Sequence, residues 1–378
     1  MKCVGLFSGI GGVELAFQRA GHETALLCEI DPAARRVLED HFPNTQIAAD
    51  VRKLERLPQA DIVTAGFPCQ DLSQAGMTRG IRGANSGLVS NVFRLIDGAR
   101  RKPRWILLEN VPFMLKLDAG RAMRYLTRNL EELGYTWAYR VLDARAFGLP
   151  QRRRRVILVA SRMEDPRCVL FGAEASNESR TTHMHAGRGF YWTEGRTGLG
   201  WALGAVPTLK GGSTIGIPSP PAVWFPKRRS IELPGIRDAE RLQGFEVDWT
   251  KCATDVDRKS RWRLIGNAVC VPMLEWVAKR FGRAFDNGAG TGKRLRSDAW
   301  PNAAWGTKGK AFEVDASAFP VRKATVSINA FLRFKTTLLS IRAAEGFYDR
   351  ASSSALSFED GFLDDVRHHI EVMRSATA

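Results

Sequence analysis

Long apolar segments and paired cysteines are both missing from this sequence. No stretch approaches the ~18 uncharged apolar residues that a membrane-spanning helix requires, and the apolar run at residues 1–7 is too short for a signal peptide. None of the six cysteines belongs to a C-x-x-C pair, and His183 and His185 have no partner ligands nearby. We therefore expect a soluble cytoplasmic protein with free thiols, no disulfide and no metal.

Acidic residues are scarce relative to basic ones. The 378 residues include 56 Lys and Arg but only 40 Asp and Glu, which gives a formal net charge of +16. A globular protein this basic usually binds a polyanion, although charge alone does not distinguish DNA from RNA or from an acidic membrane surface. With 44% hydrophobic residues, the chain can bury the core of one large domain or of several smaller ones.

Short apolar runs alternate with helical patterns up to about residue 160. Strands are expected at Lys2–Phe7, Glu23–Glu29, Asp61–Gly66, Trp105–Glu109, Tyr135–Leu142 and Val156–Ser161, and helices at Val13–Ala20, Asp31–Phe42, Leu88–Arg101 and Ala119–Leu133. Asp31 suits the N-terminal cap of its helix, and Pro32 suits the first helical position. This alternation predicts an α/β domain with a parallel sheet and helices on both faces.

The pattern changes after Arg162. Up to Pro234 the chain is rich in Gly, Pro, Ser and Thr, which predicts short strands and loops. Embedded tryptophans argue against a disordered insert, so this stretch is a candidate second domain. Further along, helices are expected at Arg237–Gly244, Leu264–Phe281, Ala324–Arg350 and Glu359–Met373, with a linker over Asp286–Thr307.

A glycine-rich turn, Phe7-Ser8-Gly9-Ile10-Gly11-Gly12, follows the first expected strand and opens a helix. It departs from the dinucleotide fingerprint, because Glu14 stands where G-x-G-x-x-G needs its last glycine. A carboxylate there would repel a pyrophosphate, whereas a cationic nucleoside without phosphates, such as S-adenosylmethionine, fits better. Glu29 is placed to accept hydrogen bonds from ribose hydroxyls, and Asp50 to meet an adenine amino group. The alternative for each acid is a helix cap or a surface charge.

A candidate nucleophile follows the strand Asp61–Gly66. Cys69 lies in the turn Pro68-Cys69-Gln70, at the carboxyl end of a strand, where open α/β sheets place their chemistry. A lone cysteine in such a place is more often structural. Glu109, however, ends the strand Trp105–Glu109 and should point into the same cleft.

Four consecutive arginines follow Gln151. They could form a solvated basic patch, but in a strand Gln151, Arg153 and Arg155 would share one face.

These segments together resemble the ordered motifs of the DNA (cytosine-5) methyltransferases. The resemblance is carried by Phe7–Gly12, Pro68-Cys69-Gln70, Glu109-Asn110-Val111, Gln151-x-Arg153-x-Arg155, Arg237–Phe245 and Gly266-Asn267-Ala268-Val269. It covers about residues 3–281, in the family's order and spacing. It implies a Rossmann-like, doubly wound mixed α/β sheet of the class I methyltransferase type, with a small, mostly irregular or β target-recognition domain.

The resemblance implies roles for individual residues. Cys69 would add to C6 of a cytosine flipped out of double-stranded DNA, and Glu109 would hydrogen-bond N3 and the 4-amino group. Arg155 and Arg153 would hold the base O2 and a phosphate. The cofactor, S-adenosylmethionine, would be held by Phe7, Ser8, Gly9, Gly11, Gly12, Glu29, Ile30, Asp50, Val51, Pro68, Asn267 and Ala268, and DNA by Gln70, Ser73, Arg155 and Thr208.

The family's order divides the chain by role. We expect a catalytic domain at 1–161, a target-recognition domain at 162–236, a return segment at 237–283 that completes the catalytic domain, and a partly helical extension at 284–378. The loop Gln70–Gly87 is expected to be mobile and to close over DNA. Thr208, in Pro207-Thr208-Leu209, resembles a family threonine of the recognition domain but could equally be an ordinary turn residue.

These expectations describe a monomeric, nucleoid-associated enzyme that methylates a short DNA site, either beside a restriction enzyme or alone. Three rival interpretations remain. One is a transfer-RNA cytosine methyltransferase on the same fold. A nicotinamide dehydrogenase is disfavoured by Glu14 and by the Pro68-Cys69-Gln70 turn. An inactive DNA-binding relative is disfavoured by the presence of Cys69 and Glu109.

Overall fold

The computed structural model describes residues 1–68, 87–175, 186–212, 219–257, 259–282, 292–296 and 299–376. The chain divides into two compact units. Unit 1 comprises 1–146, 154–176 and 269–322, and unit 2 comprises 147–153, 177–268 and 323–378. Three predicted features, Cys69, Gln70 and Ser73, lie outside the described residues, as do residues 71–86 of the expected loop and both histidines of the H-x-H pair.

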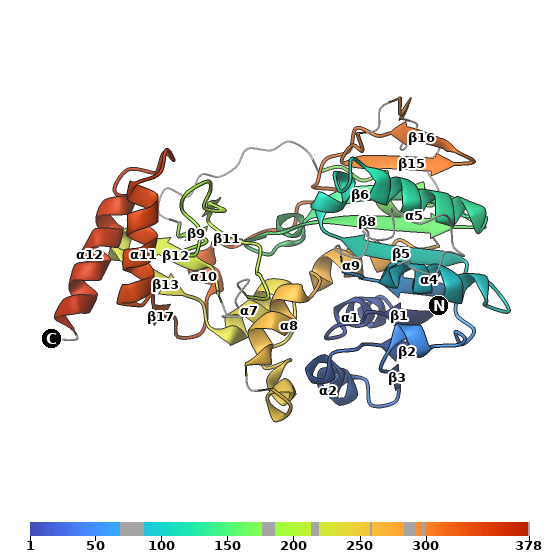
Figure 1. Ribbon diagram of the computed structural model, residues 1–378, viewed down its shortest axis with the longest axis horizontal. Coiled ribbons are helices and arrows are strands. Elements are labelled where there is room, and N and C mark those ends of the chain that lie inside the picture. Colours follow the sequence, from blue (N-terminus) through green and yellow to red (C-terminus); the bar gives the residue numbers. More distant parts are fainter. Residues whose placement is uncertain are drawn as a thin grey trace. The chain divides into compact units, whose positions relative to one another are not determined.

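Unit 1 is built on one large mixed sheet (Figure 1). In its described part the strand order is β14-β16-β15-β6-β8-β5-β4-β1-β2-β3. The bounds are β1 Lys2–Leu6, β2 Glu23–Cys28, β3 Gln46–Ala48, β4 Ile62–Ala65, β5 Trp105–Asn110, β6 Thr136–Asp143, β8 Arg154–Ser161, β14 Lys293–Arg294, β15 Ala303–Thr307 and β16 Lys310–Glu313. Strands β3, β2, β1, β4 and β5 are parallel, and from β8 outward the pairing is antiparallel.

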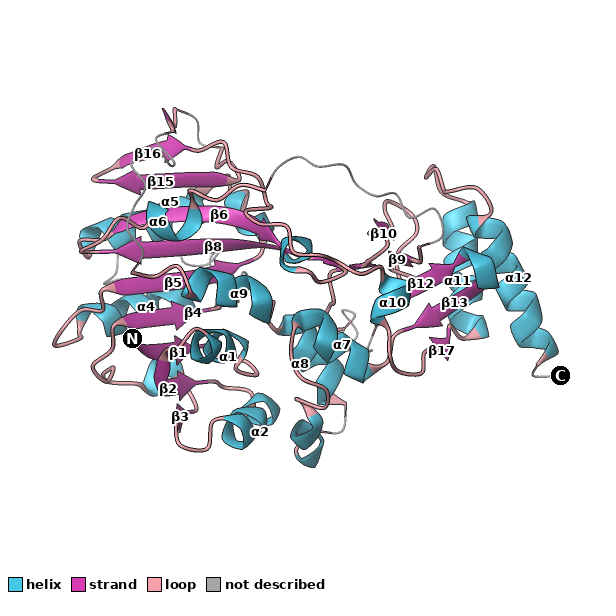
Figure 2. Ribbon diagram, turned by 180° about the vertical axis from the view of Figure 1, so that it is seen from behind, coloured by secondary structure: helices cyan, strands magenta, loops and turns pink. Residues whose placement is uncertain are grey.

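Helices cover both faces of this sheet. Figures 1 and 2 show α4 and α5 on one face and α1, α6 and α9 on the other. The helices are α1 Gly12–Arg19, α2 Pro32–His41, α4 Leu88–Asp97, α5 Arg121–Glu132, α6 Arg167–Leu170 and α9 Val271–Ala278, with short 3₁₀ turns η1 Val51–Lys53, η2 Pro112–Leu115 and η3 Ala144–Phe147. Phe93 of α4 and Leu126 of α5 pack on Ile106 and Leu158 of the sheet, all fully buried. A sheet covered on both faces explains why its strands read as continuous apolar runs.

Unit 2 contains an antiparallel sheet of order β10-β9-β12-β13-β17 in its described part. Its strands are β7 Gln151–Arg152, β9 Arg188–Phe190, β10 Ala202–Leu203, β11 Val206–Pro207, β12 Ala222–Phe225, β13 Ser230–Leu233 and β17 Thr337–Leu338, and β7 pairs only with β11 among these. Its helices are α7 Ile236–Gln243, α8 Ser260–Asn267, α10 Ile328–Phe331, α11 Ile341–Ser352 and α12 Phe362–Ser375, with η4 Pro226–Arg228 and η5 Lys251–Asp255.

The core of unit 2 is aromatic. Phe190 of β9 lies 5.0 Å from Phe347 of α11 and 5.2 Å from Phe362 of α12, measured between ring centroids. The indole of Trp224, on β12, also packs on Phe362 and donates to Asp365 Oδ2 at 3.0 Å. The C-terminal helices therefore supply about half of the core that β9 and β12 need for a buried face.

The six strands and four helices expected before residue 162 are confirmed, within a few residues at their ends. Asp31 caps α2 by accepting from the amides of Ala33 and Ala34, and Pro32 is the first residue of the helix, as predicted.

Three later expectations are wrong. The expected linker contains β14 and β15, which extend the unit 1 sheet; the helix expected at Leu264–Phe281 is two helices, separated at residues 268–270; and Ala324–Arg350 is helical only in α10 and from Ile341.

Two searches concern the described residues alone. No described helix is both long and apolar enough to cross a membrane. Nor does any cluster of three or more His, Cys, Asp or Glu side chains in the described ranges have the arrangement of a metal site.

Candidate active site

The predicted site residues of unit 1 follow the carboxyl ends of its parallel strands. Phe7 follows β1 and Glu29 follows β2 directly. Asp50 comes two residues after β3, and Pro68 comes three residues after β4. Glu109 is the second-last residue of β5. Because these five strands run in the same direction, all of these positions lie along one edge of the sheet. This is the edge at which open α/β sheets bind ligands.

The glycine-rich turn has a backbone that other residues could not adopt without strain. Gly9 and Gly11 have φ values of 56° and 80°, and Phe7 itself is left-handed with φ 58°. A Cβ on Gly11 would stand 2.4 Å from the Phe42 ring. The turn is closed by the amide of Gly11, which donates to the Ser8 carbonyl at 2.9 Å. The left-handed backbone angles and this hydrogen bond together define the conformation of the turn.

Glu29 holds this turn in place. Its Oε2 accepts from the amide of Gly9 at 2.8 Å, and its Oε1 accepts from the amide of Asp31 at 2.8 Å. Burial raises the pKa of Glu29. Each carboxylate oxygen can accept a second bond, so the predicted ribose contact is compatible with these two. The neighbouring Ile30, predicted to flank the adenine, is 59% exposed.

Asp50 has a local partner that the sequence prediction did not include. Its carboxylate accepts from the backbone amide of Arg52 at 2.9 Å and from the guanidinium of Arg52 at 2.7 Å. These hydrogen bonds lower the pKa of Asp50 to about 2. Val51 lies between them with its side chain buried. The structure therefore shows Asp50 as a cap of η1, and its contact with adenine stays a prediction.

Glu109 and Arg155 form an ion pair across the antiparallel strands β5 and β8. The Arg155 Nε lies 2.8 Å from Glu109 Oε1, and the two side chains are 10% and 12% exposed. The other carboxylate oxygen of Glu109 lies 3.4 Å from the position that a Cβ on Gly66 would take. Glu109 therefore lies directly beside the segment that leads from β4 to Cys69.

Asn110 fixes that same segment. Its side-chain amide donates to the carbonyl of Phe67 at 3.0 Å, and its Oδ1 accepts from the amide of Val111 at 2.9 Å. Asn110 is 5% exposed and Phe67 is 3% exposed. Asn110 therefore fixes the backbone at Phe67, two residues before Cys69 in the sequence.

In unit 2, Arg153 binds backbone rather than solvent. Its guanidinium donates to the carbonyls of Leu209 at 3.1 Å, Gly266 at 3.3 Å and Ala268 at 2.5 Å. The side chain is 1% exposed. These contacts tie the segment before β8 to two other predicted motifs, and the predicted contact of Arg153 with substrate stays a prediction.

Gln151 makes a matching set of buried contacts. Its Nε2 donates to the Leu242 carbonyl at 2.7 Å and its Oε1 accepts from the Leu209 amide at 3.1 Å. Gln243 then donates to the carbonyl of Ile265 at 2.8 Å. Together with Arg153, these two glutamines join the motifs at 151–153, 208–209, 242–243 and 265–268 into one hydrogen-bonded cluster.

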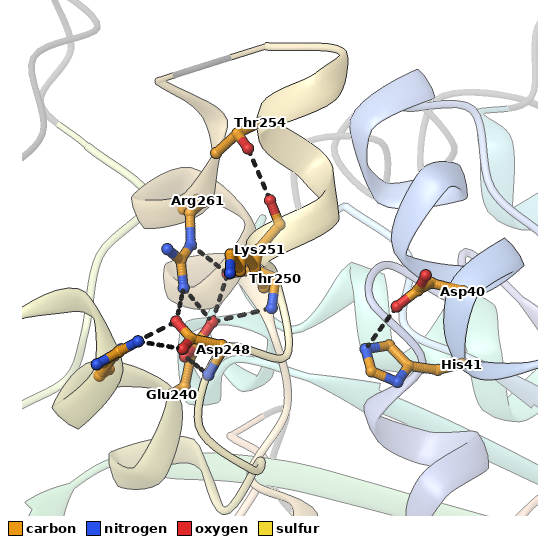
Figure 3. A network of polar contacts seen from close by, with 9 residues as sticks. Asp40, His41, Glu240, Asp248, Thr250, Lys251, Thr254 and Arg261 are labelled. Carbon is orange, nitrogen blue, oxygen red and sulfur yellow. Dashed lines mark hydrogen bonds and ion pairs between the residues drawn. The ribbon is translucent and has the colours of Figure 1, made fainter.

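The Arg237–Phe245 motif is also structural (Figure 3). Glu240 is fully buried, and its carboxylate accepts from the amides of Asp248 and Thr250 at 2.7 and 2.9 Å and from the Arg261 guanidinium at 2.9 Å. Arg237 in turn donates to Asp248 at 2.5 Å. The motif's Arg and Glu thus hold the chain from α7 to α8 in one conformation.

The remaining predicted residues also lie in unit 2. Asn267 ends α8 and is exposed, whereas Ala268 is buried. Thr208 donates from its hydroxyl to the Arg152 carbonyl at 2.8 Å, and its own carbonyl accepts from Tyr191 at 2.7 Å. Thr208 therefore has the contacts of a turn residue, and its role in DNA recognition stays a prediction.

Comparison with known proteins agrees with this geometry. The family model for the C-5 cytosine-specific DNA methylases matches residues 1–187. The chain is 47% identical to the type II methyltransferase M2.BsuMI of Bacillus subtilis over 97% of both chains. It is 30% identical to the type II methyltransferase M.MspI of Moraxella, over 75% of this chain and 71% of that relative.

The chain belongs to the C-5 cytosine-specific DNA methylases. It is an S-adenosylmethionine-dependent DNA (cytosine-5) methyltransferase, as the motifs predicted. Among solved structures it resembles S. pombe Dnmt2, with a TM-score of 0.56 and 17% identity over 74% of this chain and 97% of that one, and the Entamoeba histolytica methyltransferase EhMeth, with a TM-score of 0.52 and 14% identity over 74% and 97%. These likenesses show that the predicted class I methyltransferase fold is correct.

Sequence reasoning gave no role to two buried amide residues, Asn110 in unit 1 and Gln243 in unit 2, although both lie within the motifs that carry the resemblance. The available signal was an amide side chain at the end of an apolar strand for Asn110 and at the end of a helix for Gln243, because such an amide needs a partner once it is buried. The identity of that partner, a backbone carbonyl in each case, could not be read from the sequence.

Proposed function

We propose that unit 1 of this methyltransferase carries the chemistry and that Cys69 is its nucleophile. The observation that supports this best is the Glu109–Arg155 pair, held at the carboxyl edge of the sheet beside Gly66. Asn110 fixes the same segment two residues before Cys69. A carboxyl and a guanidinium so placed can bind N3, the 4-amino group and O2 of a cytosine.

The proposed chemistry begins with addition of the Cys69 thiolate to C6 of the base. Glu109 stabilises the adduct through hydrogen bonds to N3 and the 4-amino group, and C5 becomes nucleophilic as an enamine carbon. S-adenosylmethionine supplies the methyl group that C5 takes. Removal of the C5 proton by a base then restores the double bond between C5 and C6 and expels the thiolate.

The cofactor is proposed to lie against the glycine turn. Glu29 is held there by the amides of Gly9 and Asp31, and the carboxylate of Glu14 in the first turn of α1 would repel a phosphate. This donor set fits a nucleoside without phosphates. The proposed contacts come from Phe7, Ser8, Gly9, Gly11, Gly12, Glu29, Ile30, Asp50, Val51 and Pro68 in unit 1, and from Asn267 and Ala268 in unit 2.

Unit 2 is proposed to read double-stranded DNA. The net charge of +16 suits a polyanion, and the target base must leave the helix for Cys69 to reach C6. Gln70, Ser73, Arg155 and Thr208 are the proposed DNA contacts. We assign Arg153 to positioning, since its guanidinium is buried against three carbonyls.

The division of roles along the chain remains part of this proposal. The structure groups residues 177–268 and 323–378 in one unit and residues 269–322 with the other. We therefore propose that recognition involves a longer stretch than 162–236 and that the C-terminal helices support it. The names of the type II relatives support a role in restriction-modification. We further propose a monomeric enzyme that associates with the nucleoid through DNA and methylates a short site, either beside a companion restriction enzyme or alone.

One experiment tests the catalytic proposal. Labelled S-adenosylmethionine is incubated with unmethylated duplex DNA and, in parallel, with bulk transfer RNA, using wild-type protein and Cys69→Ser. Label on DNA that disappears in Cys69→Ser is expected, and bisulfite sequencing would then identify the site. Turnover retained by Cys69→Ser would refute the nucleophile, and label on RNA alone would refute the DNA substrate.

A further inference from the structure

A carboxylate is buried directly beneath the cofactor turn. Glu14, in the first turn of α1, is 0% exposed. Neither of its carboxylate oxygens has a hydrogen-bond partner among the described residues, and the hydroxyl of Ser8, equally buried, has none there either. Burying a charged group without a partner is costly. Glu14 has no role in the function proposed above.

The sequence makes room for this carboxylate. A Cβ on Gly5 would lie 1.9 Å from Glu14 Oε1 and 2.8 Å from the hydroxyl oxygen of Ser8. Any side chain at position 5 would therefore collide with the carboxylate. Gly5 lies in β1, immediately before the turn that begins at Phe7. The carboxylate of Glu14 thus fills the space in which a side chain of β1 would otherwise lie, next to the predicted cofactor residue Ser8.

No positive side chain in the described part of the chain pairs with Glu14. From β1 the thiol of Cys3 faces it, and from the end of β2 the charge of Glu29 acts on it, in the unfavourable direction. The only ionisable side chain of α9, Glu275, pairs with Lys279. Burial raises the pKa of Glu14 to about 7, although the nearby backbone amide of Glu14 and the hydroxyl of Ser8 lower it; the charge of Glu29 adds a smaller rise. In the free protein the Glu14 carboxylate therefore has no positive partner among the described residues when it ionises near neutral pH.

We propose that Glu14 is the buried counter-charge for the cationic cofactor, and that it makes the site prefer S-adenosylmethionine over its product. S-adenosylmethionine carries a sulfonium, whereas the sulfur of S-adenosylhomocysteine is neutral. A fixed negative charge in a low-dielectric core stabilises the first more than the second. This inference rests on S-adenosylmethionine being the cofactor of the turn, and it adds a residue that the proposed contacts did not include.

A proton is coupled to this binding. Below neutral pH the free protein holds a proton on Glu14, and the cationic cofactor favours the ionised carboxylate. Cofactor binding then releases that proton to solvent, so affinity for S-adenosylmethionine rises as pH increases from 5.5 to 7. The neutral product gains less. S-adenosylhomocysteine is therefore released more easily than from a pocket that binds it and S-adenosylmethionine with equal affinity.

The test is calorimetric titration of wild-type protein, Glu14→Gln and Glu39→Gln, with S-adenosylmethionine and with S-adenosylhomocysteine. Glu39→Gln makes the same change at an exposed position on α2. Titrations are run at pH 6 and pH 7, each in phosphate and in imidazole, because the difference in measured heat between two buffers counts released protons.

Wild-type protein and Glu39→Gln are expected to release protons on binding S-adenosylmethionine. Glu14→Gln should lose most of this release and about tenfold of its S-adenosylmethionine affinity, with a change of less than about threefold for the product. An unchanged affinity ratio, or unchanged proton release, in Glu14→Gln would overturn the proposal.

Two further arms keep the test decisive. If Glu14→Gln does not fold, Glu14→Asp and the buffer dependence of wild-type protein decide instead, and a wild-type protein that releases no proton overturns the proposal. If wild-type protein binds neither nucleoside, the cofactor assignment itself fails. A different outcome is that wild-type protein binds both nucleosides with the same affinity ratio as Glu14→Gln. That result would refute the role of Glu14 but not the cofactor assignment.

Discussion

Replacement of Asn110 by Asp tests whether the Asn110 amide positions the segment that leads to Cys69. The side chain keeps its size, but an oxygen replaces the Nδ2 that donates to the Phe67 carbonyl at 3.0 Å. Phe67 is 3% exposed, so water has little access to take over that bond. The lost hydrogen bond and the unsatisfied carbonyl together cost about 2–3 kcal/mol.

That free energy acts on two observables. Thermal unfolding of unit 1 should shift downward by about 4–12 °C, at about 2–4 °C for each kcal/mol in a domain of this size. Methyl transfer to DNA should fall by on the order of 10²-fold, because a displacement of about 1 Å in a reacting group costs that much. Affinity for S-adenosylmethionine should change little, since Asn110 contacts neither the glycine turn nor Glu29.

Asn129→Asp is the matched control. Asn129 is a buried amide on α5 that donates to the Tyr125 carbonyl at 2.7 Å, and it belongs to the same unit. It should lose comparable stability and keep single-turnover methyl transfer at a temperature where both variants are folded. The assay is transfer of labelled methyl groups to unmethylated DNA under single-turnover conditions. Equal rates for the two variants would refute the idea that Asn110 positions Cys69.

Three further outcomes follow from the same contacts. Arg155→Lys should lower methyl transfer by on the order of 10²-fold at unchanged thermal stability, since an ammonium cannot reproduce the planar donor set beside Glu109; a rate within a factor of three of wild type would contradict it. Glu240→Gln should destabilise unit 2 by about 2–3 kcal/mol in urea unfolding, because it removes the buried charge that binds Arg261 and leaves that guanidinium with the longer pair to Asp248 at 3.3 Å. Finally, raising the pKa of Glu14 from 4.5 to about 7 means that the folded protein binds more protons than the unfolded chain between these pH values. The contribution of Glu14 to the free energy of unfolding should therefore fall by about 3 kcal/mol from pH 4.5 to pH 7, and the change measured by urea unfolding between these pH values should differ by that amount in Glu14→Gln.

The elements before residue 162 could be predicted because their signals are local. Runs such as Trp105–Asn110 are apolar and bounded by turns, and the helices between them carry their own start and stop residues. Periodicity and capping act within a few residues, so a single sequence contains the information. This is why Asp31 and Pro32 were placed correctly without any knowledge of tertiary contacts.

The C-terminal region could not be predicted in the same way. β15 joins the sheet beside β6, from which it is separated by more than 150 residues, and its glycine and small residues resemble a linker. Its strand conformation depends on the partner: Gly306 packs against Trp137 so closely that a Cβ would stand 2.2 Å from the indole. Tertiary pairing here overrides a weak local preference.

Site prediction followed the same division between local and distant information. Residue types at strand ends predicted Glu29 and Glu109 in the right places, because the edge of a parallel sheet gathers them. The partners of Asp50 and Arg153 were not predicted. An aspartate two residues before an arginine can form a local ion pair or bind an adenine amino group. The sequence does not distinguish these two outcomes, and the structure shows the ion pair of Asp50 with Arg52. A buried arginine can likewise satisfy its donors with carbonyls from distant segments.

The Gln151-x-Arg153-x-Arg155 motif shows how one spacing can serve two purposes. Alternation along an extended chain buries all three side chains and exposes Arg152 and Arg154. The chain passes from unit 2 to unit 1 between Arg153 and Arg154, so neighbouring members of the motif acquire different kinds of partner. Gln151 and Arg153 bind backbone carbonyls and amides, whereas Arg155 binds the carboxylate of Glu109. A period of two predicts burial for all three residues, but it does not predict these different partners. The partners are the basis for proposing that Gln151 and Arg153 position the chain and that Arg155 contacts the base.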